Sequence, residues 1–76
     1  MKTLQVHYEG HVQGVGFRYL VKNLAREYDV SGSVKNLPDG RVELIASGDD
    51  REVKDFLEGI RTSSLKGHIT LESSSE

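Results

Sequence analysis

The segment from Gly10 to Arg18, GHVQGVGFR, places three glycines and a terminal arginine between two stretches of different periodicity. Glycine lets the backbone turn with positive φ and approach a ligand closely, so successive N–H groups can point at one oxyanion. Arg18 adds a planar, permanently charged guanidinium that matches the geometry of phosphate. A helix that begins here would favour the same sign of ligand through its free N–H groups. The segment therefore predicts a binding loop for a phosphate-like anion.

A second residue with useful chemistry, Asn36, stands in the segment from Gly32 to Glu43, GSVKNLPDGRVE. Its side-chain amide both donates and accepts hydrogen bonds, so it can orient a water molecule but cannot act as a strong base. An arginine that holds phosphate and an amide that positions water suit the attack of water on an activated phosphoryl group. A carboxylate leaving group, with a pKa of about 4, needs neither a general acid nor a metal. Asn36 can also be interpreted as no more than a turn-forming residue before Pro38.

The elements that must position these residues follow from the periodicity of apolar side chains. Apolar and polar residues alternate over 3–9 and predict a strand with one buried face. Apolar residues recur at helical spacing over 17–28 and predict an amphipathic helix, with Phe17 in its core-facing stripe. Tyr19 falls off that stripe and is a candidate neighbour of the site.

The middle of the chain predicts a hairpin and a second helix. Residues 33–47 form two extended stretches around Pro38-Asp39-Gly40, whose types favour a turn. Apolar spacing over 53–60 predicts another amphipathic helix. Asp49 and Asp50 stand at its start, where capping is a better interpretation than a catalytic carboxylate pair.

The last segment predicts one more strand and completes the fold class. Residues 68–72 are expected to be extended, with Ile69 and Leu71 facing inward, and residues 73–76 to form a frayed tail. The order β-α-β-β-α-β predicts a ferredoxin-like α+β sandwich, in which two helices cover one face of an antiparallel sheet with strand order 4-1-3-2. In this topology the loop after the first strand and the end of the second strand share one edge. Arg18 and Asn36 are therefore expected to be neighbours.

The two segments around these residues resemble the signature segments of the acylphosphatase family, G-x-V-Q-G-V-x-F-R and G-x-V-x-N-x-x-D-G-x-V-E. Both matches are complete and correctly ordered, and the similarity extends from Leu4 to about Ile60. It implies hydrolysis of acyl phosphates to a carboxylate and inorganic phosphate, with no metal and no other cofactor. The chain departs from the family in stopping at LESSSE, where members usually continue into a short fifth strand. We expect one domain over residues 1–76 that lacks this strand.

The resemblance also assigns roles within the expected site. It implies that Arg18 and Asn36 are the catalytic residues, with Arg18 binding the phosphate and Asn36 orienting the attacking water. It further implies a set of phosphate-binding residues, namely His11, Val12, Gln13, Gly14, Val15, Gly16 and Arg18.

Composition limits the other possibilities. A chain of 76 residues builds one small domain, and a formal charge of −2 provides no global positive field for a nucleic acid. The absence of cysteine fits a reducing compartment, and no apolar run resembles a signal peptide or approaches the roughly 20 residues of a membrane span. We expect a cytoplasmic monomer that binds a small-molecule acyl phosphate and neither nucleic acid nor membrane.

The three histidines do not indicate a metal site. His7, His11 and His68 lack metal-ligand spacing, so solvated surface positions are expected for them. Among them, His11 alone belongs to the glycine-rich loop, where it would tune the local potential.

Two other functions remain open from the sequence. The same loop could retain an acyl phosphate, carbamoyl phosphate or free phosphate as a binding module without turnover. An RNA-binding domain of this fold is the weaker alternative, because it would need exposed aromatics and basic charge. The chain has three tyrosines, two phenylalanines and a negative balance, which supply neither.

Overall fold

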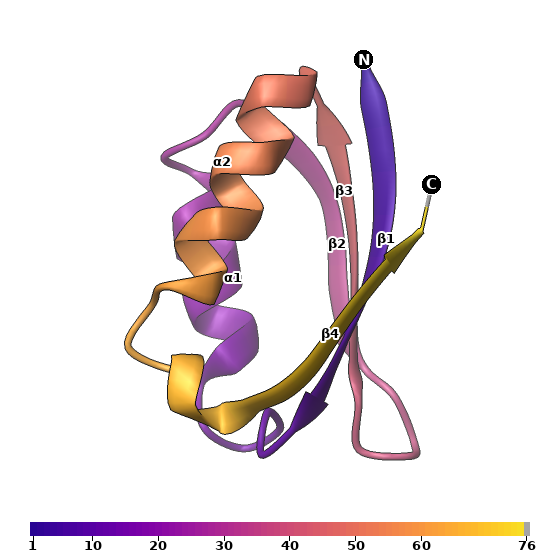
Figure 1. The fold of residues 1–76 in the computed structure, drawn as a ribbon, viewed down its shortest axis with the longest axis vertical. Coiled ribbons are helices and arrows are strands. Elements are labelled where there is room, and N and C mark those ends of the chain that lie inside the picture. Colours follow the sequence, from indigo (N-terminus) through magenta and orange to yellow (C-terminus); the bar gives the residue numbers. More distant parts are fainter. Residues whose placement is uncertain (76) are drawn as a thin grey trace.

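The computed structural model describes residues 1–75 of the chain. The elements in chain order are β1 (Lys2–Gly10), α1 (Phe17–Ala25), β2 (Val30–Asn36), β3 (Val42–Gly48), α2 (Asp50–Arg61), the short 3₁₀ helix η1 (Lys66–His68) and β4 (Ile69–Ser75). The strands form one antiparallel sheet in the order β2-β3-β1-β4. Both helices lie on one face of this sheet (Figure 1). The predicted ferredoxin-like sandwich and its strand order are confirmed.

The hydrophobic core lies between the sheet and the two helices. Strand β3 alternates strictly between buried and half-buried residues, as a strand with one covered face should. The buried set joins the sheet and both helices, and it consists of Val6, Tyr8, Val12, Phe17, Val21, Val42, Leu44, Ala46, Val53, Phe56, Leu57 and Ile60. Val12 belongs to this set although it lies in the loop after β1, so the core extends to the predicted anion-binding segment.

Helix α1 ends at Ala25, earlier than the apolar spacing predicted. Its last turn tightens, because the N–H of Glu27 donates to the carbonyl of Leu24 at 2.9 Å, an i−3 bond. Tyr28 still packs against the core, with its ring centroid 6.1 Å from that of Phe56. The apolar stripe therefore continues through a turn that is no longer α-helical.

Helix α2 is capped by Asp49 at its start, as the sequence predicted. The Asp49 carboxylate accepts the N–H of Arg51 at 3.0 Å and satisfies a free donor of the first turn. Glu52 accepts the N–H of Asp29 at 2.8 Å. This carboxylate therefore ties the connection between α1 and β2 to the start of α2.

Strand β4 departs from the expectation in length and in the direction of one side chain. It continues to Ser75, so Ser73 to Ser75 pair with β1 and are not a frayed tail. The register shifts where Gly10 pairs with Ile69 and Glu9 with Leu71. Ile69 packs against the core, whereas Leu71 is 52% exposed, so the inward prediction is correct for Ile69 and wrong for Leu71. The irregular register at the end of β1 turns the following side chains over.

Beyond this shift, Glu72 faces the helices. Its carboxylate accepts a hydrogen bond from the Arg61 guanidinium of α2 at 2.8 Å. It also lies near the buried Tyr8 hydroxyl, which has no hydrogen-bond partner among residues 1–75. Burial, with a smaller contribution from Glu72, raises the pKa of Tyr8 well above its ordinary value. The buried phenol therefore stays neutral.

Candidate active site

Three segments that are distant in sequence meet at one end of the molecule. These are the loop between β1 and α1, the turn between β2 and β3, and η1 (Figure 1). Strands β1 and β2 are both antiparallel to β3, so they run in the same direction. The loop that follows β1 and the turn that follows β2 therefore lie at the same end of the sheet. The shared edge predicted from the topology is confirmed.

The loop between β1 and α1 is fixed at its two ends and arched between them. The side chains of Val12 and Phe17 are each 1% exposed and anchor the loop in the core. Between them, Gly14 and Gly16 have φ values of 78° and 84°, in the left-handed region that glycine adopts without strain. No atom other than those of neighbouring residues lies within 4 Å of a Cβ built at either position. The glycines are therefore needed for backbone conformation and not for close packing.

The arch carries backbone donors that the protein does not use. Within the described part of the chain, the N–H groups of residues 12–16 donate no hydrogen bond, whereas that of His11 donates to the His68 carbonyl at 2.9 Å. Helix α1 follows directly with Gly16 as its N-cap, which supplies no side-chain oxygen, and its first turn holds no acidic residue. The positive end of the helix is thus left open beside the free N–H groups. This combination suits an oxyanion.

Gln13 ties this arch to the β2–β3 turn. Its Nε2 donates to the carbonyls of Leu37 and Arg41, each at 2.9 Å. The turn is itself closed by a hydrogen bond from the Leu37 N–H to the Arg41 carbonyl at 2.8 Å. The Gln13 side chain therefore holds the two segments together, and its backbone N–H remains available to a ligand. The sequence placed Gln13 in the loop but carried no signal for this cross-link.

Asn36 lies at the end of β2 on the face that the helices cover. It pairs with Val42, which is fully buried beneath the helices, and it follows Val34 by two residues, which keeps it on the same face. Arg18 lies in the first turn of α1 and is exposed. Neither side chain has a hydrogen-bond or ion-pair partner among the residues described. The fold thus brings both predicted catalytic residues to the end that carries the loop and leaves their polar groups free.

The expectation of solvated surface positions is confirmed for His11, whereas His7 and His68 are half-buried. The rings of His11 and His68 lie side by side, with centroids 5.6 Å apart, so η1 brings a second imidazole to the loop. His7 lies on the opposite face of the sheet, where its Nε2 is 3.2 Å from the Glu43 carboxylate. No group of three or more potential metal ligands occurs in residues 1–75. The same residues contain no helix with the length and apolar character needed to cross a bilayer.

Comparison with known proteins identifies the family. Residues 4–74 match the acylphosphatase family model. An acylphosphatase of Archaeoglobus fulgidus is 45% identical over 62 residues, which cover 82% of this chain and 70% of that protein. The chain belongs to the acylphosphatase family. The crystal structure of the Bacillus subtilis acylphosphatase superimposes with a TM-score of 0.90 and 37% identity, covering 99% of this chain and 83% of that one.

The acylphosphatase fold also occurs as part of a larger protein. A full-length HypF, crystallised in a phosphate- and nucleotide-bound form, matches with a TM-score of 0.88 and 30% identity. The match covers 97% of this chain but only 10% of HypF.

Proposed function

We propose that this chain hydrolyses acyl phosphates by direct attack of water on phosphorus, as its membership of the acylphosphatase family implies. The N–H groups of residues 12–16 and the Arg18 guanidinium hold the phosphoryl group, and Asn36 orients the water. The observation that supports this assignment is the row of unused N–H groups beside the uncapped end of α1. The His11 N–H takes no part, because it pairs with the His68 carbonyl.

The reaction needs positioning and charge stabilisation more than covalent chemistry. The water oxygen forms a bond to phosphorus while the bond between phosphorus and the acyl oxygen breaks, and the electron pair leaves on the carboxylate. One proton of the water stays on the phosphate product, and the other passes to a phosphate oxygen or to solvent. The loop N–H groups and Arg18 stabilise the charge on the equatorial phosphate oxygens. Asn36 accepts a hydrogen bond from the water and keeps it in line.

A metal-free hydrolysis assay tests this function. In the presence of EDTA, the protein should hydrolyse benzoyl phosphate, because its carboxylate leaving group departs without a proton donor or Lewis acid. Arg18→Ala should lower kcat/KM by about 10²- to 10³-fold, and Asn36→Ala should lower kcat by about 10²-fold. Turnover that survives both substitutions, or that EDTA abolishes, would contradict the proposal.

The similarity to one segment of HypF favours a second candidate, a binding module for acyl, carbamoyl or free phosphate. The loop would then retain the anion without useful turnover. Titration calorimetry with inorganic phosphate, run beside the hydrolysis assay, separates the two. Phosphate binding without hydrolysis of benzoyl phosphate would indicate the module.

We also infer that residues 1–76 act as a single domain, a monomer in the cytoplasm with no nucleic-acid partner. One core joins both helices and the sheet, and the chain has no cysteine and a formal charge of −2. Light scattering coupled to size exclusion should give a mass close to 8.5 kDa. A mass twice as large would contradict the inference that the chain is a monomer.

A further inference from the structure

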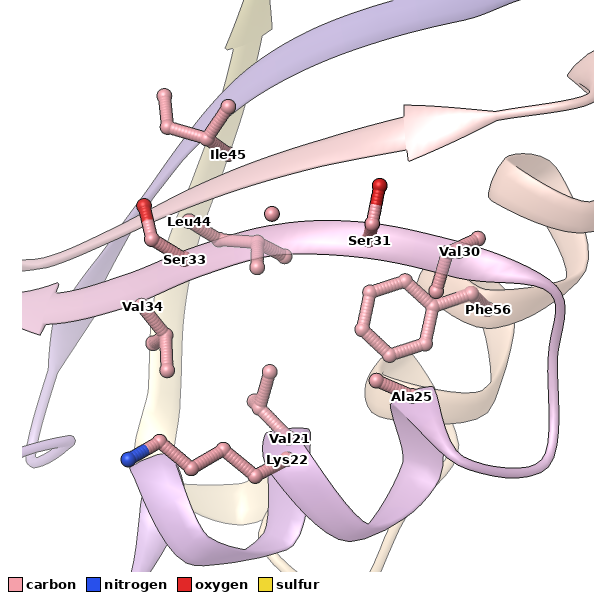
Figure 2. Close-up of a pocket in the computed structure, with 11 residues that line it drawn as sticks. Val21, Lys22, Ala25, Val30, Ser31, Ser33, Val34, Leu44, Ile45 and Phe56 are labelled. Carbon is pink, nitrogen blue, oxygen red and sulfur yellow. The ribbon is translucent and has the colours of Figure 1, made fainter.

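A groove of about 320 Å³ runs between helix α1 and strand β2. Figure 2 shows the side chain of Val21 on the α1 side of the groove and that of Val34 on the β2 side. The Phe56 ring lies toward the end away from Val34, and the hydroxyls of Ser31 and Ser33 point away from the groove. The surface turned toward the groove is therefore mainly apolar. Nothing in the described chain fills it.

Two positions along the groove carry little or no side chain. Gly32 lies between Val30 and Val34 on the face of β2 that the helices cover, and Ala25 lies opposite on α1. Gly32 has a φ of 146°, and a Cβ there would lie 1.8 Å from the Ile45 carbonyl oxygen. The backbone geometry thus excludes any other residue at this position, and the space beside it stays open.

The lining residues Val34 and Lys22 place one end of the groove toward the candidate active site. Val34 precedes Asn36 by two residues on the same face of β2, and Lys22 follows Arg18 by one turn on the same side of α1. A second hollow, of about 490 Å³, is lined by Lys2, Leu4 and residues of α2. It adjoins the start of β1, whereas the glycine loop follows the end of that strand. Of these two hollows, only the α1–β2 groove has lining residues one helical turn from Arg18 and two residues from Asn36.

We propose that the α1–β2 groove binds the acyl group of the substrate. This inference rests on the proposed function, because it needs the phosphoryl group to be held between the loop and Arg18. The acyl group then has to leave the site along one of the neighbouring surfaces, and the groove offers an apolar one of sufficient size. The substrate class is an acyl phosphate with an apolar aliphatic or aromatic acyl group, in preference to acetyl or carbamoyl phosphate.

Lys22 gives the groove a charged entrance. Its side chain extends along the groove toward the end where Val34 lies (Figure 2), and its ammonium group has no ion-pair partner in residues 1–75. The methylene stem covers apolar surface while the charge stays in solvent. An ammonium at this end attracts the anionic phosphoryl group and leaves the interior of the groove to the apolar acyl chain.

The length of the acyl chain tests the groove in solution. Each methylene that leaves water for an apolar site is worth about a fourfold gain in binding, so kcat/KM should rise from acetyl through butyryl to hexanoyl phosphate. Ala25→Leu fills the groove and should lower the ratio of kcat/KM for hexanoyl over acetyl phosphate by about tenfold. Arg26→Leu adds the same side chain to an exposed position outside the groove and should keep the wild-type ratio. A flat dependence on chain length in the wild type would overturn the proposal.

Binding without turnover distinguishes this proposal from the hydrolase assignment. Methyl resonances of Val21, Ala25 and Val34 should shift when benzylphosphonate is added to the wild-type protein, and methylphosphonate should leave them in place. Such shifts in a protein that fails to hydrolyse benzoyl phosphate would support the groove as a ligand site and contradict only the hydrolase assignment. Hydrolysis with no shift at these three methyl positions would contradict binding in the groove and support the hydrolase assignment.

Discussion

At the scale of single residues, the proposed chemistry depends on polar side chains that the fold leaves unpaired. Arg18 is exposed and Asn36 lies at the end of an edge strand, and neither has a partner among residues 1–75. The Asp39 carboxylate, by contrast, accepts hydrogen bonds from the N–H and side chain of Arg41. These bonds lower the pKa of Asp39, so this carboxylate stays ionised and engaged in the turn. The free guanidinium near the loop is thus available to a substrate anion.

The geometry of the Arg18 fork, and not its charge alone, should determine activity. Arg18→Lys keeps a positive charge but loses the planar pair of donors that matches phosphate. We expect kcat/KM for benzoyl phosphate to fall by about 10- to 100-fold, with the thermal unfolding midpoint unchanged. Arg26→Lys, at an exposed position after α1, is the matched control and should retain activity. Near-normal turnover in Arg18→Lys would show that charge alone is sufficient.

At the scale of elements, one side chain links the loop directly to the β2–β3 hairpin. Gln13 is the residue whose amide reaches from the loop to two carbonyls of the hairpin, those of Leu37 and Arg41. Both carbonyls also accept backbone bonds within the turn, so the hairpin keeps its own closure without Gln13. Loss of this amide should therefore loosen the loop from Asn36 without unfolding either segment.

Gln13→Ala should lower kcat/KM by about 10- to 100-fold, because small displacements of positioned groups carry costs of this size. Circular dichroism should show an intact fold, and amide exchange should become faster in the loop. Gln5→Ala is the matched control, because its amide donates to Glu43 on the opposite face of the sheet. If Gln13→Ala is as active as Gln5→Ala, the cross-link has no part in positioning.

At the scale of the whole molecule, the face of the sheet opposite the helices carries its own polar network. The Glu43 carboxylate accepts hydrogen bonds from His7 at 3.2 Å and from Gln5 at 3.0 Å, and it pairs with Lys35 at 3.4 Å. The hydrogen bond from His7 contributes most to lowering the pKa of Glu43, with a further contribution from Lys35. This network joins β1, β2 and β3 across the face that no helix covers.

The network should make stability depend on pH in one direction. Because the pKa of Glu43 is lower in the folded protein than its ordinary value of 4.5, its carboxylate stabilises the fold above pH 4.5. That contribution is lost as the pH falls below 4.5, where the unfolded state takes up the proton first, and down through the lower pKa of the folded state. Thermal unfolding of wild type and Glu43→Gln from pH 3 to 6 should show a difference in midpoint that narrows at acid pH. A difference independent of pH would contradict this account.

The sequence alone was sufficient for the fold class and the strand order, and it predicted the residues of the candidate site. Apolar periodicity is a local property of the chain, and it determined the faces of β1, β3, α1 and α2. The order of these elements then restricted the topology to one sandwich and brought the glycine loop to the end of β2. The motifs around Arg18 and Asn36 supplied the chemistry. Each of these inferences uses residues that are close together in the chain.

Only the tertiary structure decided features that depend on contacts between distant residues. The irregular pairing of Gly10 with Ile69 turned Leu71 to solvent and Glu72 to the helices, which alternation within β4 could not reveal. The amide of Gln13 donates to two carbonyls in the turn that follows β2. The α1–β2 groove lies where the Gly32 backbone closely approaches Ile45 of β3. Backbone hydrogen bonds and close approaches of this kind are set by the partner segment, so no local pattern in the sequence encodes them.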